Sequence, residues 1–171
     1  EMCIRDRIQI DCLLKSQTGE FPMSDFTLHT QQSAPDKSKS LLDNSFKAFG
    51  MIPNLHAVMA ESPQLLEAYQ SVHDLFSNCS FDKNELTIVW QTINKAHNCH
   101  YCVPAHSAVA QMIGADPAID DAIRNDKPLP SEKLESLRET TLAMVEQRGV
   151  LNSVQLDKFY SCLLYTSDAA D

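Results

Sequence analysis

The stretch ELTIVWQTINKAHNCHYCVPAHSAVAQMIG, residues 85–114, decides the fold. Its first half is apolar and β-branched, which on local grounds would also suit a strand. Asp82, however, precedes Glu85 by three positions, and this spacing forms the capping box of a helix. The cap and the length of the segment favour a buried helix. We expect a second helix to begin near Asn98 and to end at Gly114.

Helical spacing recurs on both sides of this stretch. Each expected helix carries a start or stop signal, with Gly50 as a stop and Asn54, Ser62, Asp116 and Ser131 as N-caps. A last helix begins in NSVQLDKFY, residues 152–160. Glycine is scarce, at 4 residues, and strand-like runs are few. These signals predict an all-α fold.

Apolar side chains at helical spacing predict the core. In the helix after Ser62 the predicted apolar stripe consists of Leu65, Leu66, Tyr69, Val72, Leu75 and Phe76. We also expect Trp90, Met112 and Met144 in the core, His29, His56 and His73 at surface or cap positions, and Cys79 as an inert buried thiol.

The charge balance limits the classes of partner. The formal net charge of −9 argues against nucleic-acid and anionic-membrane partners, since both need a basic surface. We find no apolar run long enough to span a bilayer and no signal-peptide pattern. We therefore expect a cytoplasmic protein, in which thiols stay reduced unless they cycle.

The sequences at both ends of the chain do not resemble natural protein sequence. Residues 1–7 (EMCIRDR) and 162–171 (CLLYTSDAAD) resemble translations of the DNA adapter used in transposase-based sequencing libraries. We expect residues 1–22 to be an artefactual or untranslated leader, with a native start at Met23. Residues 23–160 then form a single domain that is truncated at its C-terminus, and residues 161–171 form an artefactual tail.

The segment HNCHYCVPAH, residues 97–106, contains the candidate catalytic residues. On a helix that starts near Asn98, the side chains of Cys99, Cys102 and His106 would lie at i, i+3 and i+7 on one face. A Cys-x-x-Cys at a helix start has its thiolate stabilised by the positive end of the helix. A histidine one turn further can hold the thiol's proton. This pattern favours a redox-active dithiol.

Two other interpretations stay open. The cysteines and His106 are competent zinc ligands, although structural zinc sites usually draw ligand pairs from two separated elements. The cysteines could also be small buried core residues. Pro104 lacks an N–H group, and we expect it to loosen or kink the first turn of its helix.

These residues resemble the alkylhydroperoxidase D / carboxymuconolactone decarboxylase family, whose redox branch carries Cys-x-x-Cys-x-x-x-His after a long apolar helix. The likeness covers residues 82–114, and KAFGMIPNLHAVMAESPQLLEAYQ, residues 47–70, is also similar. It implies an all-α bundle of the alkylhydroperoxidase D type and reduction of peroxides or disulfides. It further implies Cys99, Cys102 and His106 as catalytic residues, no cofactor or metal, and a homo-trimer or hexamer at full length.

One departure concerns the family's proton relay. The family glutamate would stand at position 87, where this chain has Thr87. Gln91, one turn on, and His100, inside the motif, are the possible relay neighbours. We predict attack by Cys102 and resolution by Cys99, with a dithiol protein or small thiol as reductant. The alternatives are a zinc-binding or structural helical module and a decarboxylase-type lyase.

Overall fold

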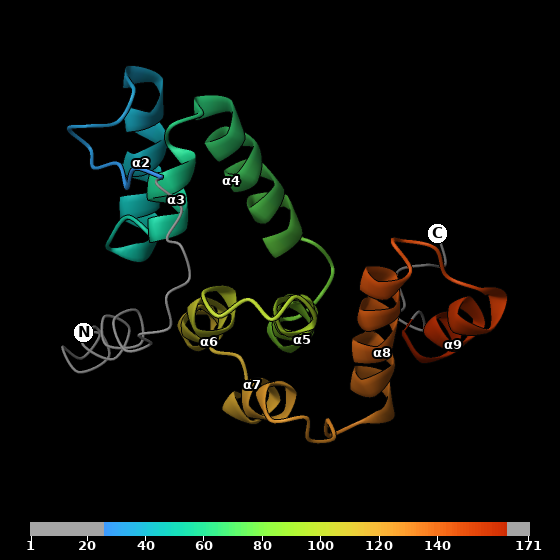
Figure 1. The fold of residues 1–171 in the computed structure, drawn as a ribbon. Coiled ribbons are helices and arrows are strands. Elements are labelled where there is room, and N and C mark those ends of the chain that lie inside the picture. The colour runs from blue at the N-terminus through green and yellow to red at the C-terminus, as the bar shows by residue number, and fades with distance from the viewer. Residues whose placement is uncertain (1–25, 164–171) are drawn as a thin grey trace. The chain divides into compact units, whose positions relative to one another are not determined.

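The computed structural model describes residues 26–163, which are helical with no strand among them. The expected all-α fold is therefore confirmed. Our expectations for residues 1–22, for Met23 and for residues 164–171 fall outside the described residues. The described chain divides into two compact units between Cys79 and Ser80, and each is considered by itself (Figure 1).

The first unit contains α2 (Asp36–Phe49), α3 (Asn54–Met59) and α4 (Pro63–Ser77), with α2 packed against both of the others. Gly50 ends α2 in the left-handed conformation, with φ 70°, as predicted. The N-cap of α3 is Pro53, so the prediction of Asn54 was wrong by one residue. Proline has a fixed φ and its carbonyl accepts the first helical bond, from the Ala57 N–H at 2.9 Å.

The apolar stripe predicted for α4 is only partly buried. Ser62 and Pro63 begin this helix as predicted, although the Ser62 side chain makes no capping hydrogen bond. Leu66 is fully buried in a core with Ala34, Leu42 and Ala60. In contrast, three members of the stripe are more than half exposed, namely Leu65, Val72 and Leu75. The periodicity thus predicted the helix correctly but overestimated the width of its buried face.

The second unit is built around α5. Its helices are α5 (Lys83–Ala96), α6 (Cys102–Ile113), α7 (Pro117–Arg124), α8 (Glu132–Glu146) and α9 (Ser153–Leu163). Helix α5 packs against α6, α7 and α8, and α9 packs against α8 (Figure 1). Helix α9 runs past residue 160 into the segment predicted as a tail. The central place of α5 explains why its sequence is apolar enough to resemble a strand.

Local capping fixes the ends of these helices. Asp82 accepts hydrogen bonds from the backbone N–H groups of Asn84 and Glu85, while the Glu85 carboxylate accepts one from the Asp82 N–H, so the predicted capping box is present. The predicted caps Asp116 and Ser131 also accept backbone hydrogen bonds, from Ala118 at 2.9 Å and Leu134 at 3.3 Å. Each bond satisfies an N–H group that the first helical turn leaves without a partner.

The core of the second unit joins α5, α7 and α8. Ile88 is fully buried against Ile119, Ile123 and Leu137. The placement of Met112 and Met144 in the core was wrong, since they are 52% and 43% exposed. Trp90 is half-buried. The flexible thioethers lie on helix faces that the other helices of this unit do not cover.

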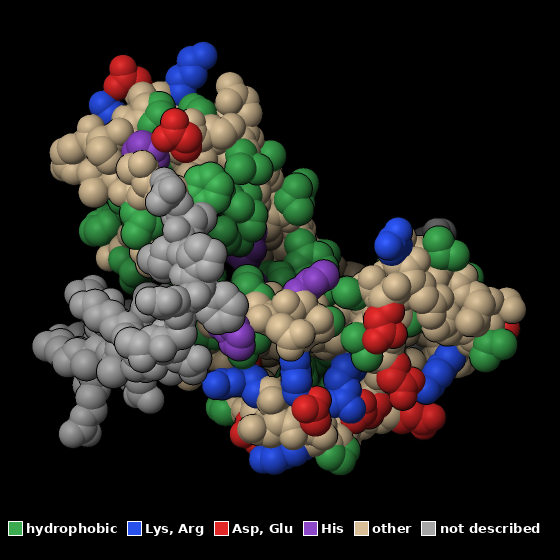
Figure 2. All heavy atoms as spheres, viewed as in Figure 1, with side chains coloured by type: hydrophobic (Ala, Val, Ile, Leu, Met, Phe, Trp, Pro, Cys, Tyr) green, Lys and Arg blue, Asp and Glu red, His purple; other side chains and the backbone are tan. Residues whose placement is uncertain are grey.

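Charged side chains of both signs lie next to one another over α7 and α8 (Figure 2). One ion pair there joins Lys127 to Asp121 at 2.7 Å. Another joins Lys133 of α8 to the buried Glu85 of α5 at 2.6 Å and so ties the two helices together. Among residues 26–163, no helix combines the length and the apolar character needed to cross a bilayer.

Candidate active site

A tight turn at Asn98 connects α5 to the cysteine motif. Asn98 adopts the left-handed conformation, with φ 50°. The Asn98 N–H donates to the Lys95 carbonyl at 2.9 Å, and the Cys99 N–H donates to the Asn94 carbonyl at 3.0 Å. These two bonds form a Schellman motif, in which asparagine is among the few residues that tolerate the positive φ. The backbone of Cys99 is thereby fixed to the last turn of α5.

Helix α6 begins at Cys102, so the prediction of a start near Asn98 was wrong. Pro104 is the third residue of the helix, and the residues on either side of it donate helical hydrogen bonds, from Val103 to the Cys99 carbonyl at 3.1 Å and from Ala105 to the Tyr101 carbonyl at 3.2 Å. It therefore lies in the first turn of a continuous helix and does not kink it. Cys99 precedes the first residue of α6, and its carbonyl accepts the hydrogen bond from the Val103 N–H. Cys102 and His106 lie on α6 four residues apart, one turn from each other.

Cys99 and Cys102 are joined by a disulfide, with their Cα atoms 5.3 Å apart. Both residues are half-buried. The backbone N–H of Cys102 points at the sulfur of Cys99, with 3.1 Å between the nitrogen and Sγ. Because this N–H belongs to the positive end of α6, it would stabilise negative charge on the Cys99 sulfur once the disulfide is opened.

His106 lies half-buried on α6, one turn after Cys102. Its ring contacts the indole of Trp90 on α5, with 5.2 Å between the ring centroids and an angle of 48° between the planes. This contact limits the orientations that the imidazole can adopt. A histidine held near a cysteine in this way is suited to take up or return a proton.

The three predicted relay neighbours lie in different surroundings. The Thr87 side chain is buried, and its hydroxyl donates to the Lys83 carbonyl of its own helix at 2.8 Å. Gln91 is also buried and reaches α6, where its amide donates to the Val103 carbonyl at 3.1 Å. His100 is exposed on the turn between the cysteines. Gln91 is thus the predicted neighbour with a hydrogen bond to the helix that carries Cys102.

Sequence reasoning missed a set of buried and partly buried polar side chains around Gln91. Asn94, Ser107 and Asp120 all take part in hydrogen bonds with Gln91. Asn94 follows Gln91 by one turn on α5, which is a spacing that the sequence displays. Asp120 is 29 residues away on α7, and no local pattern connects it to the motif.

The comparison with solved structures identifies the fold. A peroxidase-related protein from Ralstonia eutropha JMP134, described as an alkylhydroperoxidase AhpD core, superposes with a TM-score of 0.71 at 19% identity, over 87% of this chain and 80% of its own. The chain has the AhpD-like fold. A peroxidase-related protein from Silicibacter sp. TM1040 superposes with a TM-score of 0.69 at 16% identity, over 88% of this chain and 83% of its own. The fold expected from the resemblance is confirmed.

No protein-family profile and no curated protein sequence matches the chain. Within residues 26–163, no three His, Cys, Asp or Glu side chains come together in an arrangement that could hold a metal ion.

A second histidine site lies inside the first unit. The prediction of a surface or cap position for His56 was wrong, since it is 6% exposed. Its Nδ1 is 2.8 Å from the Ser45 hydroxyl oxygen, which also accepts a hydrogen bond from the Gln70 amide at 2.9 Å. Burial lowers the pKa of His56, and the nearby His73 lowers it further. Ser45 is only 2% exposed, so this group is a structural network and not a substrate site.

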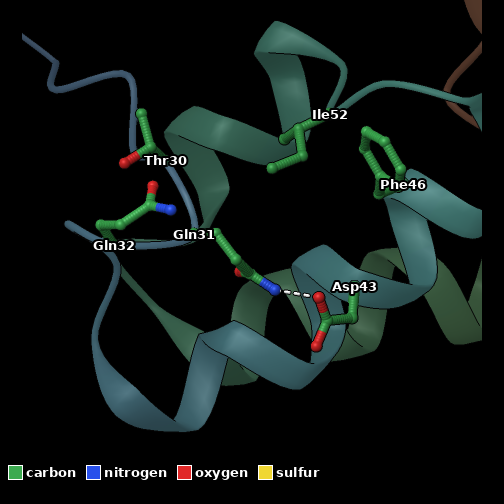
Figure 3. Close-up of a pocket in the computed structure, with 6 residues that line it drawn as sticks. All are labelled: Thr30, Gln31, Gln32, Asp43, Phe46 and Ile52. Carbon is green, nitrogen blue, oxygen red and sulfur yellow. Dashed lines mark hydrogen bonds between the residues drawn. The ribbon is translucent and has the colours of Figure 1, made fainter.

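Two further features of the first unit carry no catalytic group. An open hollow of about 360 Å³ is lined by Thr30, Gln31, Gln32, Asp43, Phe46 and Ile52 (Figure 3). Across it the Gln31 amide donates to the Asp43 carboxylate. Cys79 is exposed, so its predicted burial was wrong. Neither feature adds a group to the predicted catalytic residues Cys99, Cys102 and His106.

Proposed function

We propose that this protein is a thiol-dependent oxidoreductase that reduces peroxides or disulfides through a Cys99–Cys102 dithiol/disulfide cycle. The observation that carries the proposal is the disulfide at the start of α6 in an AhpD-like fold. The two solved structures with this fold are described as peroxidase-related, which agrees with the proposed chemistry.

The reaction begins with attack by the Cys102 thiolate on one oxygen of the peroxide. The O–O bond breaks, the sulfur becomes a sulfenic acid, and the other oxygen leaves as an alcohol or as water after taking a proton. The Cys99 thiolate then attacks the Cys102 sulfur, forming the disulfide and releasing water. An external dithiol or two small thiols supply the two electrons that return the pair to its reduced form.

We assign attack to Cys102 because His106 follows it by one turn and can accept the thiol's proton. The Cys102 N–H that points at Cys99 supports the complementary role for Cys99. A thiolate stabilised by this N–H resolves the sulfenic acid readily. It is also the better leaving group when an external thiol opens the disulfide at Cys102.

The test is peroxide consumption by the reduced protein with dithiothreitol as the regenerating reductant. We expect Cys102→Ser to abolish consumption. When dithiothreitol is removed after reduction, Cys99→Ser should consume one equivalent of peroxide and then stop, with sulfenic acid accumulating on Cys102. His106→Asn should slow consumption by about 10²–10⁴-fold, the usual contribution of an acid–base group.

Cys79→Ser is the matched control, because this cysteine is exposed and lies outside the motif. It should consume peroxide at the parent rate. Parent-like consumption by both Cys99→Ser and Cys102→Ser would refute the proposed cycle. The same assay with a small disulfide in place of the peroxide shows which class of oxidant is preferred.

A further inference from the structure

Asn94 forms hydrogen bonds with the backbones of both cysteines. Its carbonyl accepts the Cys99 N–H at 3.0 Å, and its side-chain amide donates to the Cys102 carbonyl at 3.4 Å. Asn94 itself is 9% exposed, so these contacts are shielded from water. One residue of α5 thus contacts the chain on both sides of the disulfide.

The partly buried carboxylate of Asp120 sets the direction of the hydrogen bonds that reach Asn94. The Gln91 amide nitrogen donates to the Asp120 carboxylate, and the Gln91 amide oxygen accepts from the Asn94 amide at 3.2 Å. A carboxylate can only accept. Asp120 therefore turns the Gln91 nitrogen toward α7 and the Gln91 oxygen toward Asn94. The Asn94 amide nitrogen then donates both to this oxygen and to the Cys102 carbonyl.

The surroundings of Asp120 keep its carboxylate in place. Its side chain is 15% exposed and lies 3.8 Å from the Arg124 guanidinium, one turn along α7. Arg124 in turn donates to the Ser107 hydroxyl of α6 at 3.5 Å. The Gln91 amide nitrogen is also 3.1 Å from this hydroxyl. Asp120 thus contacts α5 directly through Gln91 and is connected to α6 through Arg124 and Ser107.

We propose that Asp120 is a positioning residue for the Cys99–Cys102 pair, acting through Gln91 and Asn94. The inference rests on the proposed function, because it concerns the same pair of thiols. When the disulfide is reduced, the Asn94 contacts keep the two cysteine backbones close together. This raises the effective concentration of one thiol at the other and favours closure of the disulfide.

The experiment measures disulfide exchange with glutathione in the absence of peroxide. The reduced pair transfers two electrons and two protons to oxidised glutathione, which gives the protein disulfide and two glutathione thiols. We expect Asp120→Asn and Asn94→Ala each to lower the equilibrium constant for disulfide formation by about fivefold, the weight of one ordinary protein hydrogen bond. Asp120→Asn keeps an acceptor but can also present a donor, so it no longer fixes the direction of the Gln91 amide, whereas Asp120→Glu keeps a group that only accepts and should recover part of the loss.

Asp121→Asn is the matched control. Asp121 is the next residue on α7, and its carboxylate pairs with Lys127 at 2.7 Å and not with Gln91. This variant should stay within about twofold of the parent constant. The double variant of Asp120 and Asn94 should lose no more than either single variant, because both act through one chain of contacts.

A parent-like exchange constant for both Asp120→Asn and Asn94→Ala would overturn the proposal, even if their melting temperatures fell. If Asp120→Asn does not fold, Asn94→Ala decides by the same criterion. Failure of the proposed function gives a different result, in which the parent reaches the same exchange equilibrium with glutathione but turns over neither peroxide nor a small disulfide catalytically.

Discussion

Replacing Asn98 tests the turn that places Cys99 at the end of α5. Asn98 has a φ of 50°, a conformation that costs a typical non-glycine residue about 1–2 kcal/mol and is worse for β-branched side chains. Asparagine reduces this cost because its short side chain can hydrogen-bond locally. We expect Asn98→Val to destabilise the folded protein and Asn98→Gly to leave its stability nearly unchanged.

The expected loss of stability follows from the backbone strain at position 98 alone. The other contacts of the turn are backbone hydrogen bonds, from Asn98 to Lys95 and from Cys99 to Asn94, and they do not depend on the side chain at position 98. Asn98→Val should therefore lower the free energy of unfolding by about 1–2 kcal/mol. For a chain of 171 residues this corresponds to a fall in melting temperature of about 2–8 °C.

The assay is urea unfolding of the oxidised protein, followed by circular dichroism, so that the redox state is the same for every variant. His97→Val is the matched control, because His97 is exposed and, unlike Asn98, has a negative φ of −86°. If Asn98→Val were no less stable than His97→Val, or if Asn98→Gly lost as much stability as Asn98→Val, the left-handed turn would not be what limits this position.

Three further predictions concern stability. Ile88→Ala, at a fully buried site, should cost about 2–5 kcal/mol in urea unfolding, whereas Ile88→Val should cost about 0.5–1.5 kcal/mol; equal losses would contradict the packing described for α5. Asp82→Ala should lose about 0.5–2 kcal/mol of stability while Asp82→Asn, which keeps an acceptor, should lose less; the opposite order would argue against the capping box. The pKa of His56 is lower in the folded protein than the ordinary histidine value of 6.5, so the unfolded state binds more protons as the pH falls through this value. The melting temperature should therefore fall as the pH is lowered from about 7.5 toward 5.5. This dependence should weaken in His56→Gln but not in His100→Gln, and an unchanged pH profile in His56→Gln would refute it.

Most helix boundaries followed from the sequence because their causes are local. Asp82 and Glu85 cap α5 with contacts inside one turn, and Gly114 ends α6 with a φ of 69°. Such contacts connect residues a few positions apart, so they are visible in a printed sequence. The start of α6 was placed too early because the turn at Asn98 was read as helix. The positive φ of that residue and the position of Pro104 together explain the later start at Cys102.

The sequence by itself determined the helices and the cysteine motif, because capping, periodicity and residue spacing act over a turn or two. The tertiary structure alone decided which polar groups surround that motif. Asp120 reaches Gln91 across 29 positions, and His56 is buried beside Ser45 from a neighbouring helix. The exposure of Met112 was decided in the same way. These outcomes depend on how whole helices pack, and that packing depends on the summed contacts of many side chains.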